Sequence, residues 1–471
     1  MKILLSWLNE YGDFGDPTNA DHVQRVADAL TSLGLEVDSV TTVGDTVPGV
    51  VTARVLRLEQ HPEAAKVQRV YVDAGDGEER HVWCGAFNMA PGDVVPLATL
   101  GTTMPNGMTI ERRGILGIDS EGMLCSASEL GLGDDHSGIR VLPSDVPLGR
   151  PYGEALGLTL DVLIDADVTR NRPDCWGYVG IARDLAAKMD VEFRPPSATL
   201  DVTGDERVAG VEIIDGDRCG RFTSTVISGI EVKPSAEWMA RRLIAAGMRP
   251  ISNVVDVSNY VMLELNQPNH AYDLDTLGGG GFRIRLAADG ERLTTLDGAD
   301  RSFTSNDLFI CDANDIPIGV GGVMGGLDTE ISGATSTVAL EMAWFSLVGI
   351  GQTVTRTNLR SEASARFERG VDPYGMPLAI ARFVELLSET CPNLVVHAGA
   401  VDARSDDLPA ERRSVPVRVS AVNRILGTDL GAHDLPALLD PIGFTVSGDG
   451  ATRDVVLPTW RLDSTEEVDV I

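Results

Sequence analysis

Four hydrogen-bonding side chains interrupt an otherwise apolar stretch at residues 249–273, RPISNVVDVSNYVMLELNQPNHAYD. They are Ser258, Asn259, Gln267 and His270. Buried polar groups need hydrogen-bond partners. The stretch therefore forms either an internal polar network whose members satisfy one another or a site that binds a polar ligand, and both interpretations stay open at this point.

Glu341 is a second candidate for chemistry because it lies within the apolar run VALEMAWF at 338–345. A buried carboxylate needs a hydrogen-bond donor, from backbone or arginine nearby or from a ligand. The strand that carries it is expected to end at Glu341. A glycine-rich turn ahead of it lacks the lysine and the Ser/Thr of a phosphate loop, and is expected to let backbone approach a small ligand closely. Its glycines are Gly321, Gly322, Gly325 and Gly326.

The composition indicates a multidomain protein, because 471 residues exceed one core and domains of about 100–200 residues are usual. No apolar run reaches the roughly 18–20 residues that a membrane span needs. Six scattered cysteines without a C-x-x-C pair favour a reducing cytoplasm. The net charge of −31 disfavours non-specific binding to nucleic acid. Local basic groups, among them Arg54, Lys66 and Arg113, still allow a directed site.

Periodicity and turn signals predict a multidomain α+β fold. Several short strands with glycine turns predict a small closed barrel, either an oligonucleotide-binding (OB) fold or a generic barrel with solvated charges. Asp174 is expected to cap the helix that follows it. The regions are residues 1–40 completed by 151–198 (a small α/β unit), 41–150 (the barrel), 199–400 (a large mixed α/β domain) and 401–471 (a truncated small α+β domain).

Three motifs in the barrel region are specific in combination: HPEAAKV at 61–67, WCGAFN at 83–88 and RGILGIDSEGMLCSASEL at 113–130. They resemble the tRNA-binding OB fold of the bacterial phenylalanyl-tRNA synthetase beta subunit. The resemblance implies that Arg54, Lys66 and Arg113 meet phosphates of tRNA-Phe.

The large middle domain resembles the editing domain of the same beta subunit. The resemblance rests on NVVDVSNYVMLELNQPNHAYD at 253–273, GGVMGG at 321–326, LEMAWF at 340–345 and RFERGVDP at 366–373. In that family the pocket hydrolyses tyrosine wrongly attached to phenylalanine tRNA. Carried over by motif, the catalytic residues are Ser258 (usually threonine in the family), Asn259, His270 and Glu341, and the substrate pocket comprises Gly325, Gly326, Ser361 and Ala363.

The chemistry of this task suits these residue types. A hydrophobic phenylalanine pocket rejects an added hydroxyl poorly, whereas a second site that hydrogen-bonds the hydroxyl discriminates strongly. Glu341 is expected to accept the phenol hydrogen bond, and His270 and Asn259 to position water and the terminal adenosine. Because no Ser-His-Asp or Cys-His signature is evident, a positioned water is expected to attack the ester without a covalent intermediate.

The C-terminal motif WRLD at 460–463, followed by an acidic helix, resembles a family motif that binds Mg²⁺ together with the alpha subunit. Asp463 and Asp469 match, and the next acidic pair lies beyond Ile471, so two carboxylates give an incomplete site. An acidic, solvated helix start is the simpler interpretation of this segment.

The resemblance implies an N-terminal portion of the beta subunit, cytoplasmic and not bound to membranes. Its implied partners are tRNA-Phe and the alpha subunit, in a two-alpha two-beta tetramer that charges the tRNA with use of ATP. The alternative is a tRNA-binding and scaffold module without activity of its own. A free-standing editing protein is disfavoured because the chain stops within a motif.

Overall fold

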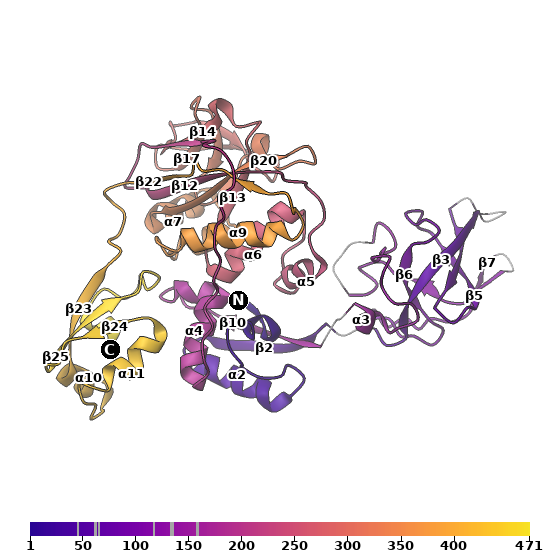
Figure 1. The fold of residues 1–471 in the computed structure, drawn as a ribbon, viewed down its shortest axis with the longest axis horizontal. Helices are drawn as coiled ribbons and strands as arrows, with labels where there is room; N and C mark the ends of the chain where they lie inside the picture. The colour runs from indigo at the N-terminus through magenta and orange to yellow at the C-terminus, as the bar shows by residue number, and fades with distance from the viewer. Residues whose placement is uncertain (45–46, 61–63, 65, 116–117, 132–135, 157–159) are drawn as a thin grey trace. The chain divides into compact units, whose positions relative to one another are not determined.

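The computed structural model describes residues 1–44, 47–60, 64, 66–115, 118–131, 136–156 and 160–471. These residues form two compact units, one of Val40–Leu163 and one of Met1–Ser39 with Ile164–Ile471 (Figure 1). Within those ranges, no helix combines the length and apolar character needed to cross a membrane. The predicted mixture of helices and sheets is confirmed.

A half-barrel of five antiparallel strands forms the unit Val40–Leu163. Alternating valines from three neighbouring strands, Val55, Val70 and Val82, fill its interior. The central hairpin turns where Asp73 Oδ1 accepts hydrogen bonds from the backbone N–H groups of two glycines with positive φ. In spatial order the strands are β5 (Glu79–Cys84), β4 (Gln68–Asp73), β3 (Val50–Gln60), β6 (Val94–Ala98) and β9 (Met123–Leu124); β7 (Arg113–Ile115), β8 (Ile118–Ser120) and α3 (Tyr152–Ala155) complete the unit.

The N-terminal segment packs through aromatic stacking. The Trp7 ring lies 3.8 Å from Tyr178 and 4.3 Å from Tyr260, centroid to centroid, and all three side chains are buried. This stack holds the N-terminal segment against a helix of the middle domain. The elements are β1 (Lys2–Leu4), α1 (Leu5–Leu8), α2 (Ala20–Ser32), β2 (Glu36–Val43), β10 (Asp161–Asp167), the 3-10 helix η1 (Pro173–Trp176) and α4 (Tyr178–Met189), with sheet order β1-β10-β2.

Asp174 does not cap a helix, contrary to the prediction from sequence. It lies inside η1, and α4 begins only after Gly177, which provides no side-chain cap. Instead the buried Asp174 carboxylate accepts two hydrogen bonds from the Arg172 guanidinium, at 3.0 and 2.9 Å. Two charge-assisted hydrogen bonds from a guanidinium stabilise a buried carboxylate more than the single backbone N–H bond of a helix cap would.

Two sheets enclose the core of the middle domain. Phe222, Val226, Ala339 and Ala343 project from the first sheet into a cluster with Phe282 and its neighbours on the second. The first sheet has the order β13 (Asn269–Asp273), β20 (Thr337–Phe345), β12 (Cys219–Ser228) and β21 (Val395–Val396), and β22 (Val401–Arg404) also pairs with β12. The second has the order β11 (Gly210–Ile213), β14 (Gly281–Leu286), β17 (Leu308–Asp312), β18 (Pro317–Val320) and β19 (Met324–Gly325).

Two helices, α6 and α9, lie together beside the first sheet (Figure 1). The predicted end of one strand is wrong, because β20 continues past Glu341 to Phe345 and places the carboxyl at its centre. Both flanks of Glu341 pair with neighbouring strands, so nothing ends the strand there. The remaining elements are α5 (Glu237–Ala245), α6 (Asn253–Leu265), η2 (Gly278–Gly280), the hairpin β15 (Arg292–Thr294) and β16 (Asp300–Ser302), η3 (Leu327–Thr329), α7 (Leu347–Thr357), α8 (Glu362–Phe367) and α9 (Met376–Ser388).

A small α+β module closes the described chain. Its core gathers Val417, Val422, Leu435 and Phe444 from helices and strands. A three-stranded antiparallel sheet has the order β23 (Arg413–Arg418), β25 (Thr452–Leu457) and β24 (Thr445–Ser447). The helices are α10 (Val419–Leu426), α11 (Leu435–Leu439), η4 (Asp440–Ile442) and α12 (Glu467–Val470).

Candidate functional site

Three neighbouring strands place His270, Glu341 and Ser224 in one row. His270 on β13 pairs directly with Glu341 on β20, and Glu341 pairs with Ser224 on β12. Directly opposed residues of antiparallel strands project from the same face of a sheet. That face is the one that carries Ala339 and Ala343 into the core between the two sheets. The polar row therefore lies within an apolar interior.

Glu341 is held by one hydrogen bond in this interior. Its side chain accepts from the Tyr272 hydroxyl, 2.9 Å from Oε2, and the residue is only 6% exposed. Burial raises the pKa of Glu341 to about 7, although the Tyr272 hydrogen bond acts in the opposite direction. The carboxyl is therefore about half protonated near neutral pH, and its Oε1 has no hydrogen-bond partner within the described chain.

His270 packs edge-to-face on Tyr272, with ring centroids 4.4 Å apart at an angle of 72°. The residue is half-buried, but its Nε2 is shielded from solvent and has no hydrogen-bond partner among the described residues. Burial lowers the pKa of His270 to about 4. The imidazole is consequently neutral at pH 7, and Nε2 remains available to a ligand or a water molecule.

At Gly325 and Gly326 other protein atoms lie so close to the backbone that no side chain fits. A Cβ on Gly325 would lie 2.9 Å from Cε1 and 3.0 Å from Nε2 of His270, so any side chain there would displace the imidazole. A Cβ on Gly326 would lie 2.7 Å from the carbonyl oxygen of Ile318. Glycine is required at both positions by neighbouring protein atoms, before any ligand is considered.

Ser361 and Ala363 lie at the start of α8. The Ser361 hydroxyl donates to the carbonyl oxygen of Val323 at 2.6 Å and accepts from the backbone N–H of Ser364 at 3.0 Å. This reciprocal cap starts the helix and ties it to the segment leading into β19. Ala363 is half-buried against the core between the sheets. The Ser361 hydroxyl thus already has a structural task.

Ser258 and Asn259 belong to α6. The Ser258 hydroxyl donates back to the carbonyl oxygen of Val254 at 3.3 Å, within its own helix. The amide of Asn269 donates to the carbonyl oxygen of Ser258 at 3.1 Å, which joins α6 to the residue before His270. Asn259 is half-buried, and no hydrogen bond of its side chain is found in the described chain. The structure therefore brings Glu341, His270 and Gly325 together directly, and Ser258 only through Asn269.

Tyr272 is a site residue that sequence reasoning missed. It follows His270 by two positions on β13, and such residues share a face of a strand. That alternation could have identified it. Other unpartnered buried polar atoms are Oγ of Ser224, Oδ1 of Asn269 and Oε1 of Gln267. Buried polar atoms in proteins normally have hydrogen-bond partners. Several unpartnered polar atoms close to His270 are therefore what a ligand-binding site would show.

A Ser-His-Asp chain of hydrogen bonds also exists, although no such signature was evident from sequence. Ser228 Oγ lies 2.9 Å from Nε2 of His397, and His397 Nδ1 lies 2.7 Å from Asp205 Oδ1. Ser228 is four residues from Ser224 along β12, about 13 Å. The chain of bonds therefore lies apart from the Glu341 row, and it fastens residues 203–205 to the end of β12.

The basic residues predicted to contact tRNA lie in the half-barrel unit. Lys66 and Arg113 are exposed. The Arg54 guanidinium donates to the carbonyl oxygens of Gly92 at 2.9 Å and Ser144 at 3.3 Å, so its charge is not cancelled by a carboxylate there. Residues 61–63 and 65 of the first barrel motif, and 116–117 of the third, lie outside the described residues.

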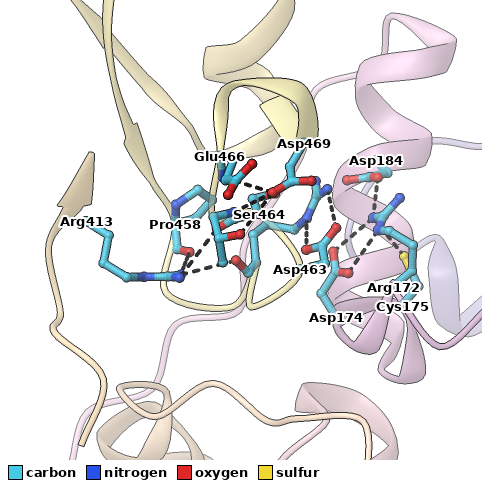
Figure 2. A network of polar contacts seen from close by, with 12 residues as sticks. Arg172, Asp174, Cys175, Asp184, Arg413, Pro458, Asp463, Ser464, Glu466 and Asp469 are labelled. Carbon is cyan, nitrogen blue, oxygen red and sulfur yellow. Dashed lines mark hydrogen bonds and ion pairs between the residues drawn. The ribbon is translucent and has the colours of Figure 1, made fainter. Parts of the chain in front are cut away.

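The two predicted magnesium ligands are already engaged. Figure 2 shows Asp463 and Asp469 in separate hydrogen-bond arrangements. Both oxygens of Asp463 accept from the Arg461 guanidinium, at 2.8 and 2.9 Å. Asp469 Oδ2 accepts from the backbone N–H groups of Thr465 and Glu466, both at 2.9 Å. A cation would have to displace Arg461 to reach Asp463, so these two residues do not fit a preformed Mg²⁺ site.

A second acidic cluster is also an ion-pair network. Ligand-type atoms of Asp174, Cys175 and Asp184 lie within 4.8 Å of one another. The Arg172 guanidinium occupies their midst and pairs with both carboxylates, at 2.9 and 2.5 Å (Figure 2). Burial raises the pKa of the Cys175 thiol, which disfavours the thiolate that a metal would need. Both carboxylates are therefore already paired with Arg172, which a metal ion would have to displace.

Comparisons with known proteins agree on one family. Family models match the chain as a tRNA binding domain (residues 50–151), a B3/4 domain (218–392) and a tRNA synthetase B5 domain (415–471). The phenylalanine–tRNA ligase beta subunit of Anaeromyxobacter dehalogenans is 42% identical and that of Geobacter metallireducens 41% identical, each over 474 residues. In both cases the match covers 100% of this chain and 58% of the relative. The chain thus spans less than two thirds of the length of these relatives.

One solved structure with a likeness is an N-terminal fragment of the phenylalanyl-tRNA synthetase beta subunit from Pyrococcus horikoshii. The likeness covers 66% of this chain and 85% of that fragment, at 12% identity and a TM-score of 0.34.

Proposed function

Because the chain belongs to the family of phenylalanine–tRNA ligase beta subunits and matches an N-terminal portion of them, we propose that it hydrolyses tyrosine from mischarged tRNA-Phe. The observation that most supports this is the pairing of His270 with Glu341 in the apolar interior, beside Gly325. The imidazole Nε2 there lacks a partner in the described chain, and the one hydrogen bond found for the carboxyl, from Tyr272, engages only Oε2. A structural polar network would be expected to satisfy both.

Selectivity for tyrosine would come from Glu341. Tyr272 donates to Oε2 at 2.9 Å and so holds the carboxyl in position, which leaves Oε1 for a second phenol, that of the substrate. A buried acceptor left without its hydrogen bond costs free energy, so an ester of phenylalanine would bind poorly. Sites that read a hydroxyl in this way discriminate by a factor of about 10⁴–10⁵.

Hydrolysis would use a water molecule placed by this chain. The water oxygen attacks the ester carbonyl carbon, the bond to the ribose oxygen breaks, and that oxygen takes up a proton as tyrosine leaves. His270, with a pKa of about 4, is a weak base at pH 7, so its Nε2 orients the water more than it removes a proton. Asn259 and Ser258 on α6 would hold the terminal adenosine. The route needs no covalent intermediate.

The other parts of the proposal concern the whole complex. The half-barrel would hold tRNA-Phe through the exposed Lys66 and Arg113 and the half-buried Arg54, because guanidinium and ammonium groups bind backbone phosphates. The alpha subunit would carry out ATP-dependent charging in a two-alpha two-beta assembly in the cytoplasm. Any Mg²⁺ bound there would need ligands beyond Asp463 and Asp469.

A tRNA-binding scaffold without hydrolytic activity is the alternative. It is favoured by the hydroxyls of Ser258 and Ser361, which are already bonded to backbone within the protein. The unpartnered Nε2 of His270 speaks against it, since a scaffold gains nothing from a buried nitrogen without a hydrogen bond.

The test is deacylation of tyrosine-charged and phenylalanine-charged tRNA-Phe by the wild-type chain, Glu341→Ala and His270→Ala. Exposed residues of the same types supply the matched controls, Glu330→Ala and His433→Ala. Wild type and both controls should release tyrosine only. Glu341→Ala should lose the preference for tyrosine, and His270→Ala should be slower with both esters. Absence of hydrolysis by the folded wild-type chain would refute autonomous editing and leave the scaffold.

A further inference from the structure

A depression of about 740 Å³ lies beside α7 and the segment leading into α8, apart from the Glu341 row. Arg356 and Arg360 line it, together with Arg170 from the segment between β10 and η1. Leu347 and Val348, which are 39% and 59% exposed, contribute apolar surface. We call this feature the arginine depression.

Both carboxylates of the arginine depression are buried beneath its cations. Asp307 has a side chain with no exposed surface, pairs with Arg356 and accepts from the Thr353 hydroxyl at 2.8 Å. Glu368, whose side chain is 5% exposed, lies 3.0 Å from Arg369, 3.6 Å from Arg170 and 3.7 Å from Arg360. An approaching molecule would meet guanidinium groups before it met either carboxylate.

The arginines keep most of their surface in solvent. Arg170 and Arg360 have side chains that are 73% and 64% exposed, and Arg356 is 36% exposed. Four cations, including Arg369, share two carboxylates, so the feature carries a local positive charge in a chain with a net charge of −31. Burial, and then the nearby charges of Arg170 and Arg360, lower the pKa of Arg369 despite its pairing with Glu368. An anion would relieve this crowding of like charges.

The arginine depression is connected to the proposed hydrolytic site through a short path. Arg360 immediately precedes Ser361, whose hydroxyl bonds Val323, and Gly325 lies two residues further on against His270. Bond geometry along this path limits the distance between the Cα atoms of Arg360 and Gly325 to less than about 20 Å. A strand of a few nucleotides could reach from one to the other.

We propose that the arginine depression binds a backbone phosphate of the single-stranded RNA end whose terminal ester enters the Glu341 site. Guanidinium groups bind phosphate oxygens in a bidentate manner, which ammonium groups do not reproduce. Leu347 and Val348 offer apolar contact to the attached sugar or base. The ester-bearing end is the ligand of the proposed function, so the identity of the RNA rests on that function. The phosphate site itself does not depend on hydrolysis.

Binding is measured separately from hydrolysis to keep the two proposals distinguishable. The full chain is titrated with a fluorescent single-stranded RNA oligonucleotide and with uncharged tRNA-Phe, over a series of salt concentrations. The test variant is Arg170→Ala with Arg360→Ala, and both side chains are exposed enough for the fold to persist. The matched control is Arg292→Ala, 58% exposed and paired with Asp300 on a hairpin elsewhere in the same domain.

The double variant should bind the oligonucleotide about tenfold more weakly or worse, with the salt slope reduced by about 0.7, because one single-strand phosphate contact contributes about 0.7. Arg292→Ala should match wild type. With charged tRNA the double variant should raise KM for deacylation more than it changes kcat. An unchanged affinity and salt slope in the double variant would overturn the proposal. It would also be overturned if polyglutamate competed for the site more strongly than RNA, because that result would indicate an acidic protein partner. Loss of RNA binding without any wild-type hydrolysis would support the phosphate site and reject only the editing function.

Discussion

The titration of Glu341 offers a direct test of the candidate site, with Glu341→Gln as the perturbation. The glutamine keeps the size of the side chain and cannot ionise. An ordinary glutamate in an unfolded chain titrates near 4.5, and burial raises the folded pKa to about 7. The folded state therefore binds the proton more tightly than the unfolded state. The stabilising effect of protonation is fully present below pH 4.5 and is lost as pH rises to about 7.

The magnitude follows from the size of the pKa shift. A shift of one unit corresponds to about 1.4 kcal/mol, so wild type should lose about 3 kcal/mol relative to Glu341→Gln between pH 4.5 and pH 7. Above that range the difference should be constant. Tyr272→Phe removes the hydrogen bond that lowers this pKa, so Glu341 should then titrate at higher pH.

Two measurements check this prediction. The first is pH-difference infrared spectroscopy of the carboxylic acid band, with Glu341→Gln subtracted from wild type, which reports the pKa of this one group. The second is urea unfolding across the same pH range, followed by a probe in the middle domain because the chain has several domains. A carboxyl that titrates below about pH 5 in wild type, or a stability difference independent of pH, would refute the inference that Glu341 lies in an apolar interior.

Three further outcomes are expected. Gly325→Ala should destabilise the middle domain by about 1–3 kcal/mol and abolish deacylation, because the added Cβ would clash with the His270 imidazole. Thermal unfolding and the hydrolysis assay measure the two effects, and a fully active variant would contradict the prediction. Ser228→Ala should leave deacylation within about twofold of wild type, because its hydrogen bond to His397 is structural, and a large loss would instead implicate a serine nucleophile. Calorimetric titration with Mg²⁺ should give the same heat signal for wild type and for Asp463→Asn, because the Arg461 guanidinium already binds both oxygens of that carboxylate. Tight Mg²⁺ binding by wild type that is lost in Asp463→Asn would contradict this expectation.

Several features could be predicted from local sequence because local rules govern them. The apolar run around Glu341 predicts a buried carboxyl, and the residue is indeed 6% exposed. The glycine-rich turn predicts that backbone approaches a small ligand closely, which stays a prediction, and the structure shows only that a Cβ on Gly325 would lie 2.9 Å from Cε1 of His270. The atoms that approach belong to His270 of the same protein, a partner that the turn itself does not identify.

Two local predictions failed for different reasons. Asp174 has the residue type of a helix cap, but the guanidinium of Arg172, two residues earlier, donates two charge-assisted hydrogen bonds to it within the same turn. The strand through Glu341 was expected to end at the charge, but pairing on both sides carries β20 on to Phe345. In the second case contacts between segments distant in the chain outweighed the local preference.

By itself the sequence determined the family, the mixture of helices and sheets, and the residue types that line the candidate site, because motifs and hydrophobic periodicity are properties of neighbouring residues. Only the tertiary structure decided which of those residues meet. The pairing of His270 with Glu341, the Tyr272 hydrogen bond and the gathering of Arg170 with Arg360 join positions from 69 to 190 residues apart. Such contacts depend on strand register and on the packing of separate elements, and a local pattern does not contain that information.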